Sequence, residues 1–119
     1  MPFQRFDRSR LKLRPLAERA HDLDRSSLLF PGSAYDRSED PALPVLAGRI
    51  RDAKEHRSSV ILMLGAHVLR RGTGPLLIDL MRRGLVVLIA LNGAGAIHDY
   101  EMALVGGTSE SVAKYVRTG

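Results

Sequence analysis

Cysteine and tryptophan are absent from this chain of 119 residues, and aromatic residues make up only 5% of it. The absence of cysteine excludes disulfides, thiolate metal ligands and cysteine nucleophiles. Long apolar runs are also missing. The two clearest cover residues 60–64 and 85–91, far short of the roughly 20 residues that a bilayer-spanning helix needs. The charged N-terminal stretch MPFQRFDRSRLKLRP lacks the apolar block of a secretory signal. We therefore expect a cytoplasmic protein with no membrane partner.

Positive charge is in modest excess, a formal +5 at pH 7, and arginine carries most of it. The basic residues are spread along the chain, without a run of five or six like charges and without interleaved aromatic residues. Proteins that bind single-stranded nucleic acid place aromatic stacking platforms beside their basic residues. The pattern therefore favours a solvated, arginine-rich surface over a nucleic-acid interface, which remains the minor alternative.

Helical and strand-like apolar patterns alternate from about residue 42 onwards. They predict a helix over 42–56 and a strand over 60–64. A second helix should begin at 72–75, with Thr73 as its N-cap, and end at Gly84, before a strand over 85–91. A turn over 92–96, a helix over 97–104 and a last helix that begins at 108–110 should follow. This order predicts an α/β fold, a Rossmann-like parallel sheet with flanking helices. Continuous apolar strands fit a parallel sheet because its strands are covered on both faces.

The number of strands limits that prediction. Two strands cannot form a stable open sheet alone, so either weak strands lie within residues 1–41 or the chain is an incomplete portion of a larger domain. Residues 1–41 are polar and rich in turn formers, with room for one short helix over about 16–24. We expect 1–41 to form a polar N-terminal arm and 42–119 to form a partial cofactor-binding α/β domain, a fragment of a longer protein.

Glycine-containing loops follow both predicted strands, over residues 65–74 and 92–99. In open α/β sheets, ligands bind outside the carboxyl ends of the strands. Gly93 and Gly95 would let the backbone approach a phosphate closely, and the following helix would present free N–H groups to it. The dinucleotide fingerprint is incomplete, because His98 stands where its third glycine belongs. A ligand-binding loop and a plain tight turn both stay open.

Three ionisable residues cluster behind this loop. His98 and Glu101 share a helix face, whereas Asp99 points elsewhere. A metal site would need His67 as a further ligand, and we expect none. Asp99 fits equally well as an acid near a helix N-terminus. His98 could act as a general acid or base only with an orienting partner, which the sequence does not identify.

The stretch VILMLGAHVLRRGTGPLLIDLMRRGLVVLIALNGAGAIHDYEMAL, residues 60–104, resembles the early cofactor-binding region of deoxyhypusine synthases and their bacterial deoxyhypusine-synthase-like relatives. In that family a strand, a Ser-Asn-like loop and a Ser-Gly lead into a helix. The next strand ends in Thr-Ala-Gly-Gly or Thr-Gly-Ala, followed by an acidic pair. The resemblance implies an NAD cofactor, spermidine dehydrogenation with aminobutyl transfer, a polyamine substrate, and a homotetramer with active sites between subunits.

By position, the resemblance also assigns site residues. Ala66 and His67 fall on the Ser-Asn cofactor contacts, Asn92 to Ala94 fall on the Thr-Ala-Gly, and His98 and Asp99 fall on the acidic pair. With the loop glycines added, the predicted cofactor-binding residues are Gly65, Ala66, His67, Asn92, Gly93, Ala94, Gly95, His98 and Asp99.

Two departures from the family pattern bear on activity. Arg70 replaces a small hydroxyl residue, and His98 replaces a carboxylate. The family's catalytic lysine lies in a downstream segment that this chain does not contain, and Lys114 does not match it. We therefore predict no catalytic residue here and expect the isolated chain to be inactive, as the N-terminal part of a transferase of the deoxyhypusine synthase type. The alternative is a non-catalytic Rossmann-like nucleotide-binding or assembly module.

Overall fold

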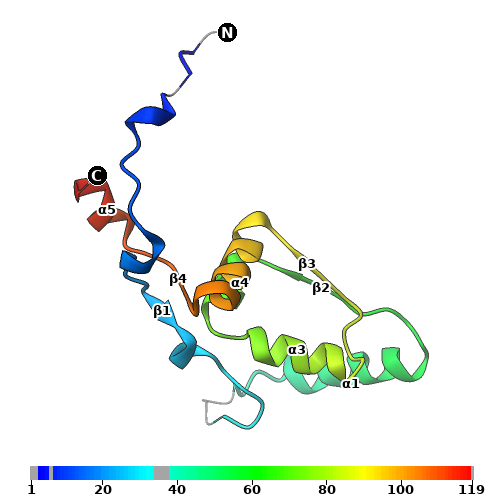
Figure 1. Cartoon of the computed structure of the whole chain (residues 1–119). Helices are drawn as coiled ribbons and strands as arrows, with labels where there is room; N and C mark the ends of the chain where they lie inside the picture. The colour runs from blue at the N-terminus through cyan, green and yellow to red at the C-terminus, as the bar shows by residue number, and fades with distance from the viewer. Residues whose placement is uncertain (1–2, 6, 34–37, 119) are drawn as a thin grey trace.

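The computed structural model describes residues 3–5, 7–33 and 38–118. Short helices and strands alternate along it, and most of the regular structure follows residue 41 (Figure 1). In chain order the elements are the 3-10 turns η1 (Arg8–Arg10) and η2 (Leu16–Glu18), strand β1 (Leu23–Asp24), the 3-10 turn η3 (Arg25–Ser27), helix α1 (Ala42–Glu55), strand β2 (Ile61–Leu64), helices α2 (Ala66–Arg70) and α3 (Gly74–Arg82), strand β3 (Leu88–Leu91), helix α4 (Gly93–Val105), strand β4 (Gly107–Thr108) and helix α5 (Val112–Thr118).

β2 and β3 form a parallel pair, as the sequence predicts. Leu62 lies opposite Ile89, and Leu64 lies opposite Leu91 at the carboxyl ends. The chain passes between the strands through α2 and α3, and α4 packs against β3. The fold is therefore mixed α/β with a parallel strand pair. Within the described residues this sheet has two strands, so the larger Rossmann-like sheet stays a prediction.

A second, antiparallel pair joins the N-terminal arm to the end of the chain. Leu23 of β1 lies opposite Thr108 of β4, and the Asp22 N–H donates to the Ser109 carbonyl at 2.9 Å. The predicted helix over 16–24 is therefore wrong beyond the turn η2, because the backbone pairs with β4 in extended form. The arm does contain a weak strand, but this strand does not extend the β2–β3 sheet.

The arm fits closely against glycines of the body. A Cβ atom on Gly72 would lie 1.9 Å from the Ser27 carbonyl oxygen. A Cβ on Gly107 would lie 2.8 Å from the His21 ring. The Leu29 N–H also donates to the Gly72 carbonyl at 2.8 Å. Only glycine permits such close contacts, so residues 21–29 pack tightly against the rest of the structure.

Several predicted boundaries are wrong by a few residues. The turn over 92–96 does not form, because the Asn92 side chain caps α4 and the helix begins at Gly93. The stretch 65–74 contains the helix α2, which begins directly after β2. The last helix starts at Val112, since residues 107–108 pair with β1. Thr73 precedes α3, but its hydroxyl donates to the Val68 carbonyl at 2.8 Å and does not cap the helix.

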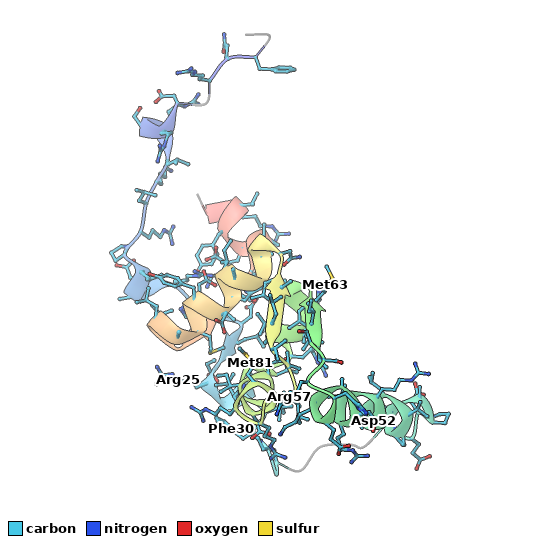
Figure 2. All side chains as sticks on the ribbon, turned by 90° about the vertical axis from the view of Figure 1, so that its right-hand side faces the viewer. Arg25, Phe30, Asp52, Arg57, Met63 and Met81 are labelled. Carbon is cyan, nitrogen blue, oxygen red and sulfur yellow. The ribbon has the colours of Figure 1, made fainter. Side chains whose placement is uncertain are left out.

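The expectation that both strands are covered on both faces is also wrong. Met63 is 80% exposed and Ile61 is 58% exposed, and Figure 2 shows Met63 pointing outward from the sheet on the side opposite α4. Val86 is the one buried hydrophobic side chain in the described part of the chain. The Cα radius of gyration is 19.1 Å, whereas a compact domain of this length has about 13.5 Å. The start of the N-terminal arm extends away from the other elements (Figure 1), and the exposed side chains leave much apolar surface uncovered in the described part of the chain.

Candidate functional site

The carboxyl edge of the β2–β3 pair brings together the two segments that the sequence singles out. Because Leu64 and Leu91 are register partners, Gly65 and Asn92 follow them at the same edge. Helices α2 and α4 start there, and they pack extensively against each other (Figure 1). Two helix N-termini, with their unpaired N–H groups and positive dipole ends, therefore meet beside the strand ends.

Asn92 determines which N–H groups of α4 stay available. Its side-chain oxygen accepts from the Gly95 N–H at 2.8 Å, and its carbonyl accepts from the Ala96 N–H at 3.2 Å. The first N–H groups of a helix have no intrahelical acceptor. Within the described residues, this leaves the N–H groups of Gly93 and Ala94 at the helix start for an outside acceptor.

The predicted glycines differ in what surrounds them. At Gly65 and at Gly93, a Cβ atom would meet nothing within 4 Å, so the edge is open at both positions. Gly95 is buried, and a Cβ there would lie 3.3 Å from the Asn92 side-chain oxygen and 3.5 Å from Leu91. Gly95 therefore serves the packing of the cap, whereas Gly65 and Gly93 border open space.

Asp99 lies on the α3 side of α4. It borders a cavity of about 210 Å³ whose lining is mostly apolar. The other lining residues come from α2, α3 and β3 and their junctions: Leu69, Gly74, Leu77, Ile78, Met81, Ile89 and Leu91. A carboxylate at the rim of an apolar hollow beside a strand end suits a ligand with an apolar body and hydroxyl groups.

His98 belongs to a different cluster from Asp99. Its Nδ1 lies 2.7 Å from the hydroxyl of Thr108 on β4, and that hydroxyl donates to Glu101 Oε2 at 2.6 Å. Thr108 is only 2% exposed. Thr108 is the orienting partner for His98 that sequence reasoning missed. It lies ten residues away, beyond the two glycines that end α4, so no local pattern marks it.

Glu101 links this cluster to the arm. Arg19 donates from Nη1 to Glu101 Oε1 at 2.7 Å, and its Nε lies 3.1 Å from Glu110 Oε2. The hydrogen bond from Arg19, aided by that from Thr108, lowers the pKa of Glu101 against the effect of desolvation. The pKa of Arg19 is raised by the same bond to Glu101. Both groups therefore stay charged near neutral pH.

The predicted residues thus divide into three groups, of which Gly95 alone is buried in the packing of the α4 cap. Gly65, Ala66, Asn92, Gly93, Ala94 and Asp99 lie on or beside the strand edge, as does His67, which is exposed in the first turn of α2. His98 instead faces the contact between α4, β4 and the arm. No three His, Asp or Glu side chains converge on a metal-sized site among the described residues.

No family model, no curated protein and no solved structure matches this chain. Within the described residues, no helix is long and apolar enough to cross a membrane.

Proposed function

We propose that this chain is a nucleotide-binding module and that the paired starts of α2 and α4 bind the phosphates of NAD. The observation that carries the proposal is the in-register end of β2 and β3, from which both helices leave side by side. Parallel α/β sheets bind their ligands at such an edge. The resemblance of residues 60–104 to deoxyhypusine synthases supports NAD among the nucleotides.

The charges at the edge support an anionic ligand. Neither α2 nor α4 has an acidic residue in its first turn, so nothing there neutralises the positive ends of the helix dipoles. The N–H groups of Gly93 and Ala94 would donate to a phosphate, because the Asn92 side chain already satisfies Gly95. Open space at Gly65 and Gly93 would admit the phosphate next to the backbone.

The neighbouring cavity supports a nucleoside beside that phosphate. Its apolar wall includes Leu69, Leu77 and Leu91, and Asp99 contributes the carboxylate. Ribose hydroxyls donate well to a carboxylate in dinucleotide-binding proteins. In this proposal Asp99 therefore accepts from ribose, whereas His98 stays with Thr108 and takes no part in cofactor binding.

The wider proposal is the N-terminal part of a deoxyhypusine-synthase-like aminobutyl transferase. Two features belong with it: a Rossmann-like sheet that continues beyond β2 and β3, and a homo-oligomer whose subunits share a polyamine site. In this wider proposal the described residues supply cofactor contacts. NAD binding can be tested without that wider activity.

A charge reversal at the open glycine tests the proposal. Gly93→Asp places a carboxylate in the first turn of α4, where the helix dipole favours it by about 0.3–1 kcal/mol. We expect the thermal midpoint to hold or rise, while calorimetric affinity for NAD falls at least tenfold. Gly93→Ala is the matched control, since its methyl group meets nothing within 4 Å. Equal NAD affinity in both variants would refute binding at this edge.

A second candidate function, an assembly module without cofactor, is favoured by the exposed face of the β2–β3 pair. Calorimetry with NAD distinguishes this assembly module from the nucleotide-binding module. An assembly module associates without NAD and shows no binding heat when NAD is added. A nucleotide-binding module gives saturable binding heat whatever its state of association.

A further inference from the structure

We infer that the bare face of the β2–β3 pair is a docking surface for a second copy of this chain, and that helix α1 of each copy covers the sheet of the other. This inference does not rest on NAD binding, because the face lies on the side of the sheet away from α4 and not at its carboxyl edge.

The sheet face has one chemical character. Ile61, Met63 and Leu88 alternate along the two strands and share that side, at 58%, 80% and 47% exposure. Ala90 lies opposite Met63 in the register and continues the apolar surface. Charged residues are absent from both strands, which read ILML and LIAL. Parallel strands are otherwise covered on both faces, so this one needs an apolar cover.

Helix α1 is amphipathic, and the apolar side chains of its first half are exposed. Its first half exposes Leu43, Val45 and Leu46 at 46%, 56% and 53%. The helix makes no extensive contact with another element in the described part of the chain. A 14-residue helix is about 21 Å long, long enough to cross two strands of four residues each. One molecule therefore carries both an uncovered sheet and the type of helix that covers sheets.

The helix is held away from its own sheet. The Lys54 ammonium donates to the Arg83 carbonyl at 2.6 Å, which ties the end of α1 to the end of α3. Among the described residues, α1 makes no extensive contact with β2 or β3. Arg57 follows α1 at φ +55°, so the connection to β2 already turns sharply. A helix from a second copy can cover the sheet without breaking these contacts.

The available area fits a pair of copies. Six side chains of roughly 100 Å² each, about half exposed, offer roughly 300 Å² of apolar surface per copy. In a two-fold exchange, the apolar surfaces of both copies are buried. Such surfaces make up about 57% of the area of a typical interface. The interface would then bury roughly 1,000 Å² in total, the lower bound for a specific association. A partner that covered the sheet alone would use half of this surface and leave α1 bare.

Complementation between two disrupting variants tests the exchange. The full chain should sediment at twice its 13.1 kDa mass. Met63→Lys alters both sheets of a dimer and Leu46→Glu alters both helices, so each variant alone should raise the dissociation constant at least tenfold. In a one-to-one mixture, each mixed dimer keeps one native contact and gains one Lys–Glu pair, so dimers should return. Val116→Lys, on the 76% exposed Val116 of α5, is the matched control and should stay dimeric.

Cysteine pairing locates the contact independently, because the chain has no cysteine of its own. Leu46→Cys and Met63→Cys made in separate chains should form a disulfide between chains after mixing and mild oxidation. Circular dichroism of each variant verifies folding, and Leu46→Glu on an exposed helix face keeps the test valid even if Met63→Lys unfolds. A monomeric full chain, dimers that neither variant weakens, or a disulfide formed only within a doubly substituted chain would each overturn the exchange.

Discussion

His98 Nδ1 lies 2.7 Å from the Thr108 hydroxyl, and the same hydroxyl lies 2.6 Å from Glu101 Oε2. A hydroxyl has one proton to donate. Since Glu101 receives that proton, the hydroxyl accepts from His98 and fixes the ring proton on Nδ1. The contact joins α4 to β4 at the most buried side chain of the described residues, and Arg19 extends it to the arm.

Removal of the Thr108 hydroxyl should destabilise the fold. Thr108→Val keeps the side-chain shape but leaves His98 and Glu101 without their shared partner, which costs about 1–3 kcal/mol when the groups are part-buried. Urea unfolding followed by circular dichroism measures the loss. Thr108→Ser retains the hydroxyl and should lose clearly less. Equal losses for valine and serine would mean that the methyl group, and not the hydroxyl, stabilises the contact.

Acid should release the arm. The folded-state pKa of Glu101 is lowered, chiefly by the hydrogen bond from Arg19, so the stability it contributes is fully present above the unfolded pKa of about 4.3. That stability is lost as pH falls through the lower folded pKa. We expect the free energy of unfolding to fall more steeply below about pH 4.3 in the native chain than in Glu101→Gln. Parallel pH profiles of the two proteins would contradict this assignment.

Two glycine substitutions distinguish the energetic cost of crowding the arm at Gly72 from the cost of backbone strain. Gly72 has φ +77° and a Cβ there would clash with Ser27, whereas Gly32 has φ +89° and open space around it. Gly32→Ala should cost about 1 kcal/mol, from the positive φ alone. Gly72→Ala adds overpacking of roughly 1–3 kcal/mol and should expose residues 19–29 to limited proteolysis. Equal proteolysis rates in the two variants would mean that the arm does not depend on this contact.

The Asn92 side chain, which caps α4, should stabilise the fold by as much as N-cap side chains usually do. Asn92→Ala removes the acceptor for the Gly95 N–H and should cost about 1 kcal/mol in thermal or urea unfolding. Asn92→Asp keeps an acceptor and should retain most of the stability. If alanine and aspartate behave alike, the cap at Asn92 contributes little and α4 is stabilised by its packing on α2.

The sequence predicted the parts of the fold that depend on local patterns. The helix over 42–56 and the strand over 60–64 follow from apolar spacing, and the structure has them at Ala42–Glu55 and Ile61–Leu64. The sequence also predicted that the segments after the two strands come together, since parallel strands end at one edge. The NAD-binding role of those residues stays a prediction.

Long-range pairing accounts for what the sequence could not predict. The pairing of Leu23 with Thr108 joins segments 85 residues apart, and nothing local marks either one as a strand. Thr108 and Arg19 became partners of His98 and Glu101 only through that pairing. The exposure of Met63 was missed because the apolar residues of a strand predict that both of its faces are buried. The sequence does not show whether the same chain or another copy would cover them.

The most direct test of nucleotide binding at the strand edge is an amide chemical-shift titration of the isotope-labelled chain with NAD. We predict saturable shifts at Gly65, Ala66, Gly93 and Ala94, with the amides of Leu23 and Thr108 unmoved. Absence of shifts at millimolar NAD, or shifts confined to the arm and β4, would contradict a nucleotide site formed by the starts of α2 and α4.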